Sequence, residues 1–378
     1  MRVCHFSSVH HVWDTRVFYR ECISLAKRHE VTLIAIGDKG CYVKNGVQVI
    51  SVNKPKNFIE RFCFTIFKVF ILAVKQEANV YHIHDAELIP FGIILSILGK
   101  KVIYDIHENT YDDILLKPWI KPNKRKLLAN LYNVILWFGS KFMHYIVVVA
   151  DPKFLNKFFV NQTNASVIQN FANVPDYDKY VVENRSKLSG NQLFYVGMIK
   201  DMYYDIDPIL EAIFILHKRG IKCHIHLIGY FGSGISPHLN ELANWEQVKD
   251  QVSYYGFLDT QEAYQISMQC KIGLCIKNQP ESMLVSHERK LFEYMAIGLP
   301  AVFCNQGIYE DLNQKYKIGK SVKITDSIAV ADAIESLLLH DEILMSMSEN
   351  ARQAAQDHFN WNREEKKLFD LYDSLYFS

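Results

Sequence analysis

The 378-residue sequence lacks the features that mark fibrous, disordered or disulfide-stapled proteins. It contains no internal repeat and no low-complexity tract, which argues against a solenoid. Its eight cysteines include no CxxC pair and lie mostly in apolar runs, so we expect buried thiols in a reducing compartment and neither disulfides nor a cysteine zinc site. With 49% hydrophobic and 22% charged residues the chain can bury real cores, and its length suggests about two domains.

Long apolar runs are missing as well. The most apolar window, residues 62–74, contains Lys68 and is only 13 residues long, whereas a membrane-spanning helix needs about 20 apolar residues. This window therefore predicts a buried or interfacial helix. The chain enters a strand-like run at residue 2 without the apolar segment of a signal peptide, so we expect a cytoplasmic protein.

A large net charge is also absent, but the two halves of the chain differ. The 42 Lys+Arg and 41 Asp+Glu residues leave a formal net charge of +1. Residues 1–170 hold 22 basic and 13 acidic side chains, a net charge of +9, whereas residues 171–378 have a net charge of −8. Such an asymmetry often marks the basic half as facing phosphates or an anionic membrane.

Short runs rich in Val, Ile and Tyr alternate with helical patterns along almost the whole chain, which predicts parallel sheets covered by helices on both faces. The strands expected in the first half are residues 2–8, 30–37, 47–52, 80–85, 101–107 and 145–150. Those expected in the second half are residues 193–199, 223–229, 252–258, 272–276, 300–304 and 321–324. A polar stretch, residues 174–192, separates the two sets.

The expected fold class is therefore α/β, with two doubly wound, Rossmann-like domains that face each other across a cleft. We expect the first domain to cover residues 1–175 and the second to cover residues 190–355. Residues 356–378 predict an amphipathic terminal helix that packs back toward the first domain. Because ligands bind beyond the carboxyl ends of parallel strands, the site should lie in the loops that follow the strands.

The most informative segment is residues 286–302. It predicts a helix on which Lys290 and Glu293 share one side near the start and which Gly298 ends. The partial positive charge of a helix start together with Lys290 suits a diphosphate, and Glu293 can accept ribose hydroxyls. A surface salt pair on an ordinary amphipathic helix would have the same spacing.

This segment resembles the nucleotide-sugar-binding helix of GT-B glycosyltransferases, the retaining family 4 in particular. Further matching segments follow one another in the family's order over nearly the whole chain: residues 7–37, 81–92, 100–109, 168–175, 193–199, 226–231, 252–259 and 359–372. The Asp14-Thr15-Arg16 start is most similar to members from bacterial capsule, O-antigen lipopolysaccharide and exopolysaccharide clusters.

The resemblance implies roles for single residues. His107 matches the family's histidine near the reacting centre of the donor sugar, and Lys290 would neutralise the departing diphosphate, so these two are the catalytic candidates. The implied donor-binding residues are Gly197, Lys200, Gly229, Phe257, Leu258, Lys290 and Glu293.

On the acceptor side, the loops after the first strands offer candidates that we expect to face the cleft. Arg16 can pair with an acceptor phosphate or with a carboxylate across the cleft, and an exposed arginine at a helix start is the equal alternative. The acceptor-side candidates are His11, Asp14, Arg16 and Glu108.

Three positions depart from the family's pattern, and one of them is Tyr204-Asp205, which stands where the family has Lys/Arg-Gly. Met198 stands where the family usually has arginine, and Lys200 can replace part of the lost phosphate charge. Val285 stands where the family's Glu-x7-Glu motif needs its first acid. The resemblance therefore implies either unusual contacts to the donor sugar or a weakened activity.

We expect no cofactor and no metal, because the nucleotide sugar is a substrate and the family transfers without a bound cation. Asp205-Ile206-Asp207 spells the DxD motif of metal-dependent glycosyltransferases, but Pro208 follows, so a helix cap is the simpler interpretation. Two pairs of histidines lie two residues apart on expected strands, without a clear further metal ligand. These pairs are His82 with His84 and His224 with His226.

The basic excess of the first half has a local source in residues 117–128, where lysine and arginine alternate with tryptophan and aliphatic side chains. An apolar run follows directly. This pattern suits an anionic bilayer surface, near which each cation contributes about 1 kcal/mol. Nucleic acid is a poorer partner, because the acidic second half would repel it and no motif for reading it is present.

We therefore expect a retaining glycosyltransferase that moves a sugar from a nucleotide sugar, a UDP-sugar, to a polyprenyl-diphosphate-linked glycan. Its expected place is the inner face of a bacterial cell membrane, in surface polysaccharide synthesis. A sugar-nucleotide 2-epimerase of GT-B fold would use the same donor pocket. A non-catalytic glycan-assembly subunit would fit the departures at Met198 and Val285.

Overall fold

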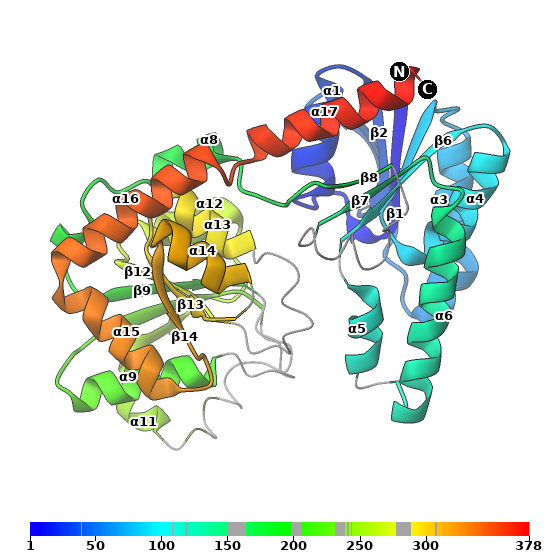
Figure 1. Ribbon diagram of the computed structural model, residues 1–378. Coiled ribbons are helices and arrows are strands. Elements are labelled where there is room, and N and C mark those ends of the chain that lie inside the picture. Colours follow the sequence, from blue (N-terminus) through cyan, green and yellow to red (C-terminus); the bar gives the residue numbers. More distant parts are fainter. Residues whose placement is uncertain are drawn as a thin grey trace. The chain divides into compact units, whose positions relative to one another are not determined.

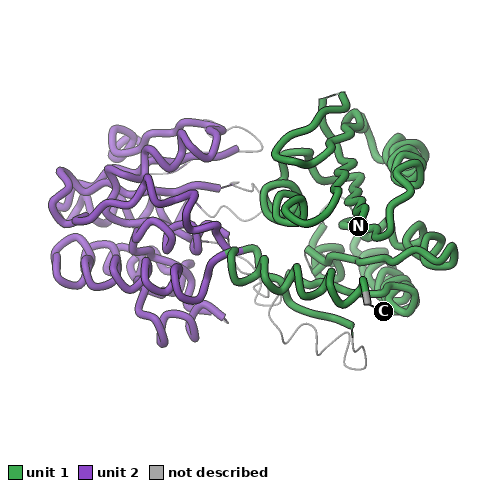
Figure 2. Tube along the Cα trace, turned by 90° about the horizontal axis from the view of Figure 1, so that it is seen from above, with its two compact units in different colours: residues 1–170, 285–287, 361–378 green, residues 171–284, 288–360 purple. Residues whose placement is uncertain are grey.

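The computed structural model describes the chain except for residues 39, 108, 118–119, 150–163, 198–205, 231–238, 240–241, 243, 277–288, 307 and 378. The described residues form two compact units (Figure 2). Those of unit 1 lie within residues 1–170 and 361–378, and those of unit 2 within residues 171–284 and 288–360. The chain thus passes from unit 1 to unit 2 at Asn170 and Phe171, and the C-terminal segment belongs to unit 1.

Unit 1 contains an eight-stranded sheet in the order β3-β4-β2-β1-β5-β6-β7-β8, in which every pair is parallel except β3 with β4 (Figure 1). The strands are β1 (Arg2–His11), β2 (Glu30–Ile36), β3 (Gly40–Lys44), β4 (Val47–Val52), β5 (Val80–Ile83), β6 (Lys101–Ile106), β7 (Tyr145–Val148) and β8 (Ala165–Val167). The sequence pattern missed β3, whose side chains are half-buried or exposed, and the three-residue β8, because neither strand has an apolar period.

Helices cover both faces of this sheet, and each face has its own cluster of buried side chains. On one face lie η1 (Val17–Cys22), α1 (Ile23–Ala26) and the terminal helix α17 (Trp361–Phe377). On the other face lie α3 (Ile66–Val74), α4 (Ile89–Ile97) and α6 (Pro122–Ser140) (Figure 1). In the part of unit 1 that the structure describes, the remaining helices are α2 (Phe58–Glu60), η2 (Arg61–Thr65), η3 (Ala86–Leu88) and α5 (Thr110–Leu116).

Unit 2 contains a parallel six-stranded sheet in the order β11-β10-β9-β12-β13-β14. The strands are β9 (Gln192–Val196), β10 (His224–Ile228), β11 (Val252–Tyr254), β12 (Ile272–Cys275), β13 (Ala301–Cys304) and β14 (Gly319–Val322). The longer helices are α9 (Asp207–Lys218), α12 (Thr260–Ser267), α13 (Arg289–Ala296), α14 (Ile308–Tyr316), α15 (Ser327–Leu339) and α16 (Asp341–Asp357). Both units are thus Rossmann-like, as the alternating pattern predicts.

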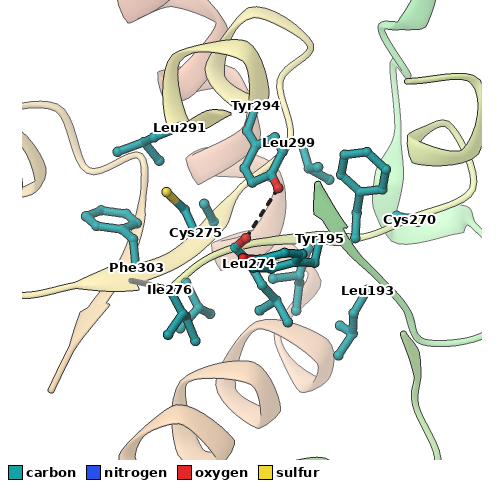
Figure 3. Packing of buried hydrophobic residues seen from close by; sticks show 14 of the residues in the cluster. Leu193, Tyr195, Cys270, Leu274, Cys275, Ile276, Leu291, Tyr294, Leu299 and Phe303 are labelled. Atoms are coloured by element: carbon teal, nitrogen blue, oxygen red, sulfur yellow. Dashed lines mark hydrogen bonds between the residues drawn. The ribbon is translucent and has the colours of Figure 1, made fainter. Parts of the chain in front are cut away.

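Helix α13 is anchored on this sheet by a tyrosine as well as by apolar contacts. The Tyr294 hydroxyl donates to the Leu274 carbonyl of β12 at 3.3 Å (Figure 3). The same hydroxyl accepts the Val196 N–H of β9 at 3.2 Å. The neighbouring Leu291 and Leu299 are buried in the same cluster. The position of α13 relative to the strand ends is therefore set by the core.

The polar stretch 174–192 packs into unit 2 as short helical turns, α8 (Val174–Tyr177), η4 (Asp178–Tyr180) and η5 (Arg185–Lys187). Arg185 is fully buried there. Its guanidinium donates to four backbone carbonyls at 2.7–3.1 Å, those of Ser267, Cys270, Ile297 and Gly298. Hydrophobic periodicity could not predict that this stretch packs into unit 2, because it is held there by the hydrogen bonds of one buried arginine and not by an apolar face.

Among the described residues, no helix is both long enough and apolar enough to cross a bilayer. The window 62–74 forms η2 and α3 instead, and only part of its side chains are buried.

Candidate functional site

Three neighbouring strands of unit 2 end in a cluster of glycine backbones. Gly197 after β9 has φ +151°, Gly229 after β10 has φ +143°, and Gly256 after β11 has φ +67°. A Cβ on Gly229 would lie 1.8 Å from the Gly197 carbonyl oxygen, so no other residue fits at Gly229 without moving this backbone. The Gly229 N–H donates to the Gly256 carbonyl at 2.8 Å. Three glycines thus lie at the carboxyl edge of the sheet, where ligands of parallel sheets bind; Gly229 is buried, and Gly197 and Gly256 are half-buried.

Lys290, in the first turn of α13, reaches this edge. Its Nζ atom lies 3.4 Å from the Tyr195 hydroxyl and 4.5 Å from the centroid of the Tyr195 ring. A Cβ on Gly197 would lie 3.3 Å from the same nitrogen. The structure therefore brings together Lys290, the start of α13 and the end of β9. An ammonium beside a glycine backbone at a helix start is suited to a diphosphate.

Glu293 does not share the environment of Lys290, although it lies one turn further along α13. Its side chain is buried, and its two carboxylate oxygens accept the hydroxyls of Tyr177 and Tyr264, each at 2.7 Å. Arg289 Nε lies 3.0 Å from the same carboxylate. Burial and the negative charge of Glu293 together raise the pKa of Tyr264. The carboxylate thus ties three elements of unit 2 together, and a ribose hydroxyl would have to displace one of these partners.

The base-side candidates lie after β11. Phe257 is 81% exposed and Leu258 is half-buried, and they follow Gly256 directly. An aromatic ring held free of the core beside the glycine edge is available for stacking. Lys200 lies outside the described residues, as do Met198 and Val285.

In unit 1, His107 follows β6 and is hydrogen-bonded on the side facing the sheet. Its Nε2 atom lies 3.1 Å from Asp105 Oδ2 and 3.1 Å from His84 Nδ1. The ring of His10 lies 4.4 Å from that of His107, between centroids. Burial alone would lower the pKa of His10, but its hydrogen bond with Asp14 and the negative charges of Asp85, Asp14 and Asp105 together raise it. His107 thus has a fixed orientation at the carboxyl end of its strand, with 15% of its side chain exposed.

Arg16 is buried and already paired, so the structure contradicts the alternative of an exposed arginine at a helix start. Its side chain is 2% exposed and forms a bidentate pair with Asp105, at 2.9 and 3.2 Å. It also donates to the Ile168 carbonyl and pairs with Glu21 at 2.9 Å. Burial by itself would raise the pKa of Asp105, but the guanidinium holds it well below its usual range. The carboxylate that Arg16 pairs with thus lies in its own unit.

The other acceptor-side candidates differ in exposure. Asp14 caps the first helical turn, because its carboxylate accepts the N–H groups of Arg16 and Val17 at 2.8 and 2.9 Å. His11, the last residue of β1, is exposed. Glu108 lies outside the described residues. Among the described acceptor-side candidates, only His11 has an exposed side chain.

The motifs that were considered for metal binding have different environments in the structure. Asp207 is the first residue of α9 with Pro208 next to it, and Asp205 is outside the described residues. His226 hydrogen-bonds to Tyr255 and Gln192, at 2.8 and 2.9 Å, so both its nitrogens are satisfied within the sheet. The pair of His82 on β5 and His84 just after it differs, because the fold brings further polar side chains next to these two histidines.

Sequence reasoning missed several polar residues around these sites, chiefly His5, Glu21, Asp105, Tyr177 and Tyr264. All five are buried. The available signal was a titratable side chain inside an apolar strand, which is rare unless it is paired. His5 and Asp105 have this signature, since His5 lies between the buried Cys4 and Phe6 and Asp105 lies between the buried Tyr104 and Ile106.

Residues 176–354 match the family model described as glycosyl transferases group 1. Sucrose-phosphate synthase from Thermosynechococcus elongatus is similar in structure, with a TM-score of 0.74 and 14% identity over 99% of both chains. Anabaena HepE in complex with UDP-glucose gives a TM-score of 0.70 at 14% identity, over 99% of this chain and 100% of that one. A trehalose-6-phosphate synthase gives 0.68 at 12% identity, over 99% of each chain. The search of curated proteins found no match.

Proposed function

We propose that this chain, a glycosyltransferase of GT-B fold with a group 1 match over residues 176–354, transfers a sugar from a UDP-sugar to a polyprenyl-diphosphate-linked glycan at a membrane surface. The reaction we propose retains the anomeric configuration and serves bacterial surface polysaccharide synthesis. It needs no metal at the donor. The observation that carries the proposal is Lys290 beside the glycine edge of unit 2.

The donor assignment is supported by charge and by a structural relative. The diphosphate would lie against the backbone at Gly197 and Gly229, and Lys290 would stabilise the charge that develops on it as the bond to the sugar breaks. Phe257 would stack on the base. HepE, similar over the whole chain, was solved with UDP and with UDP-glucose.

The retaining course is supported by the study of the trehalose-6-phosphate synthase, whose subject is glycosyl transfer with retention. In the proposed reaction His107 faces the donor sugar. Because Asp105 and His84 hold its Nε2 side at 3.1 Å, the rest of the ring is what it presents to a ligand. There it can hydrogen-bond the sugar and support the oxocarbenium-like state.

The lipid-linked acceptor and the peripheral membrane location are supported by one face of unit 1. Helices α3, α4 and α6 lie side by side on the same face of the sheet (Figure 1). Their outer sides expose large apolar side chains, an unusual density for a soluble surface. Those at least 50% exposed on α3, α4 and α6, with Leu98 at the end of α4, are Phe67, Ile71, Ile97, Leu98, Leu127, Leu131, Val134, Trp137 and Phe138.

Basic side chains border this apolar face. Lys121, Lys124 and Lys126 are exposed at the start of α6, and Lys141 at its end lies 3.4 Å above the Trp137 ring. An apolar face with a basic rim is the pattern of a helix that lies in the interface of an anionic bilayer. Acidic headgroups on the inner leaflet of a bacterial membrane would match it.

Incubation with a panel of UDP- and GDP-sugars and a synthetic polyprenyl-diphosphate glycan tests the proposed function. We expect a glycosylated lipid product with one UDP-sugar, and calorimetric binding of UDP. Epimer formed from UDP-GlcNAc without acceptor would replace the proposal by a 2-epimerase. Failure to bind any nucleotide sugar in the panel would point to a non-catalytic assembly subunit.

Replacing Lys121, Lys124 and Lys126 together with glutamine should lower binding to anionic vesicles at least about tenfold, because each cation contributes about 1 kcal/mol near the surface. Sedimentation with phosphatidylglycerol vesicles measures the effect. Arg125 is retained, because its Nε donates to the Ile120 carbonyl at 2.8 Å and supports the helix start. A matched variant carries Lys315, Lys320 and Lys323 of unit 2 as glutamine and should sediment like the wild type; equal losses in both variants would contradict the assignment of this face.

A further inference from the structure

Three histidines and one glutamate from separate elements meet in the interior of unit 1. His5 lies on β1, Glu21 on η1, His82 on β5, and His84 just after β5. One ligand atom from each lies within 4.8 Å of those of the other three. His5, Glu21 and His82 are fully buried, and His84 is 4% exposed. An interior holds such a group of polar side chains only when their hydrogen-bonding and charge requirements are met.

Two of these side chains have a buried atom with no hydrogen-bond partner among the described residues. They are His82 at Nε2 and Glu21 at its carboxylate. Arg16 forms an ion pair with Glu21 Oε1 at 2.9 Å, which leaves Oε2 toward the histidines, 3.9 Å from His5 Nδ1. His5 Nδ1 in turn lies 3.0 Å from His84 Nε2. The unsatisfied atoms thus belong to the same cluster, and a cation between them would satisfy both.

The opposite nitrogen of each ring is held from outside the cluster. Nδ1 of His82 and Nε2 of His5 lie 2.9 and 3.3 Å from the Tyr372 hydroxyl of α17. Nδ1 of His84 lies 3.1 Å from Nε2 of His107. A histidine that binds a metal usually has its second nitrogen hydrogen-bonded, which fixes the orientation of the ring. All three rings meet this requirement.

We propose that His5, Glu21, His82 and His84 bind one zinc ion through His5 Nδ1, His82 Nε2, His84 Nε2 and Glu21 Oε2. Imidazole and carboxylate are zinc ligands, and four protein ligands complete a tetrahedral shell with no position left for substrate, so the site is structural. Zn–N bonds of about 2.0–2.1 Å place ligand atoms about 3.3 Å apart. The 3.0 Å between His5 Nδ1 and His84 Nε2 is close to that spacing.

The ion would join β1, β5 and η1, and through the Tyr372 hydroxyl it would also fix α17 on unit 1. The positive charge of Arg16 beside the site is compensated by its bidentate pair with Asp105. Because the ligands are buried, the metal enters while unit 1 folds and is then retained. The site is independent of the donor assignment in unit 2.

The test is the metal content of the full-length, tag-free chain produced in zinc-supplemented medium and dialysed against a mild chelator. We expect about one zinc per chain by mass spectrometry, and a higher melting temperature for chain refolded with zinc than with EDTA. His82→Gln should lower the zinc content about tenfold or more. The matched control is His226→Gln, which also removes a strand histidine but one bound to Tyr255 and Gln192, and it should retain the metal.

One further measurement does not depend on the folding of a variant. Wild-type chain refolded with cobalt instead of zinc should show the strong visible absorption of tetrahedral cobalt with nitrogen and oxygen ligands. Wild-type chain with less than about 0.1 zinc per molecule, and no change in melting temperature on refolding with zinc, would overturn the proposal in favour of a metal-free chain of hydrogen-bonded imidazoles. Zinc retained in full by a folded His82→Gln variant would overturn it as well.

Discussion

Replacing Lys290 with alanine is expected to lower kcat/KM for sugar transfer by about 10²–10³, the usual loss when one donor to a developing negative charge is removed. The Nζ atom lies at the end of β9, 3.4 Å from the Tyr195 hydroxyl and next to Gly197, in the described part of the site where backbone and helix start converge. The negative charge that leaves with UDP would lose the stabilising ammonium of Lys290. Steady-state kinetics with the best donor of the panel measure the change.

The same substitution should weaken UDP binding, because the product keeps the diphosphate. Lys290→Arg keeps the positive charge but spreads it over a planar fork, so we expect part of the activity to return. Lys249→Ala is the matched control, since it removes a lysine of unit 2 that pairs with Glu246 on the surface, and its kcat/KM should stay within about twofold of the wild type. If Lys290→Ala bound and turned over the donor like the wild type, the donor site would have to lie elsewhere.

Replacing Arg185 with methionine is expected to lower the free energy of unfolding of unit 2 by about 3 kcal/mol or more. Methionine has a similar length but no hydrogen-bond donor. All four backbone carbonyls that accept from the guanidinium would therefore lose a hydrogen bond. Burial already lowers the pKa of Arg185 to about 10, which still leaves it protonated at neutral pH. The desolvation that methionine avoids does not compensate, because the polar acceptors remain buried.

Urea denaturation followed by circular dichroism measures this change. At about 1–3 kcal/mol per molar urea, the unfolding midpoint of unit 2 should fall by about 1 M or more with an unchanged slope. Arg219→Met is the matched control, because that guanidinium pairs with Asp332 and Glu335 on the surface, where water and salt screen the ion pairs, so the unfolding midpoint should change little. Equal midpoints for the two variants would show that the carbonyls find other partners.

The strand pattern illustrates how far local sequence determines the fold. Val31 to Val52 includes two apolar runs that predict β2 and β4, and both form. The hairpin between β3 and β4 is indicated by its turn residues and not by a period of apolar side chains. Asn45 and Gly46 both have positive φ, +51° and +78°, the two-residue turn that an Asn-Gly pair favours. Turn chemistry therefore would have found the strand that hydrophobic periodicity missed.

On the site, the sequence placed His107, Gly197, Gly229 and Lys290 at the carboxyl ends of strands or at a helix start, and the structure has them there. The sequence could not show that the side chains of Arg16 and Glu293 are buried. A charged residue near the start of a helix is exposed or buried according to what packs on it, and Asp105 and Tyr264 come from elsewhere in the chain.

The alternation of apolar runs and helical periods was sufficient to specify two doubly wound units, because burial of one face of each element is a local property of the chain. The partners of buried charges were decided only by the tertiary structure. His5, Glu21, His82 and His84 are far apart in sequence, and only the parallel pairing of β1 with β5 and the packing of η1 bring them together. Pairing of this kind depends on which strands become neighbours, and that information is not present in any single segment.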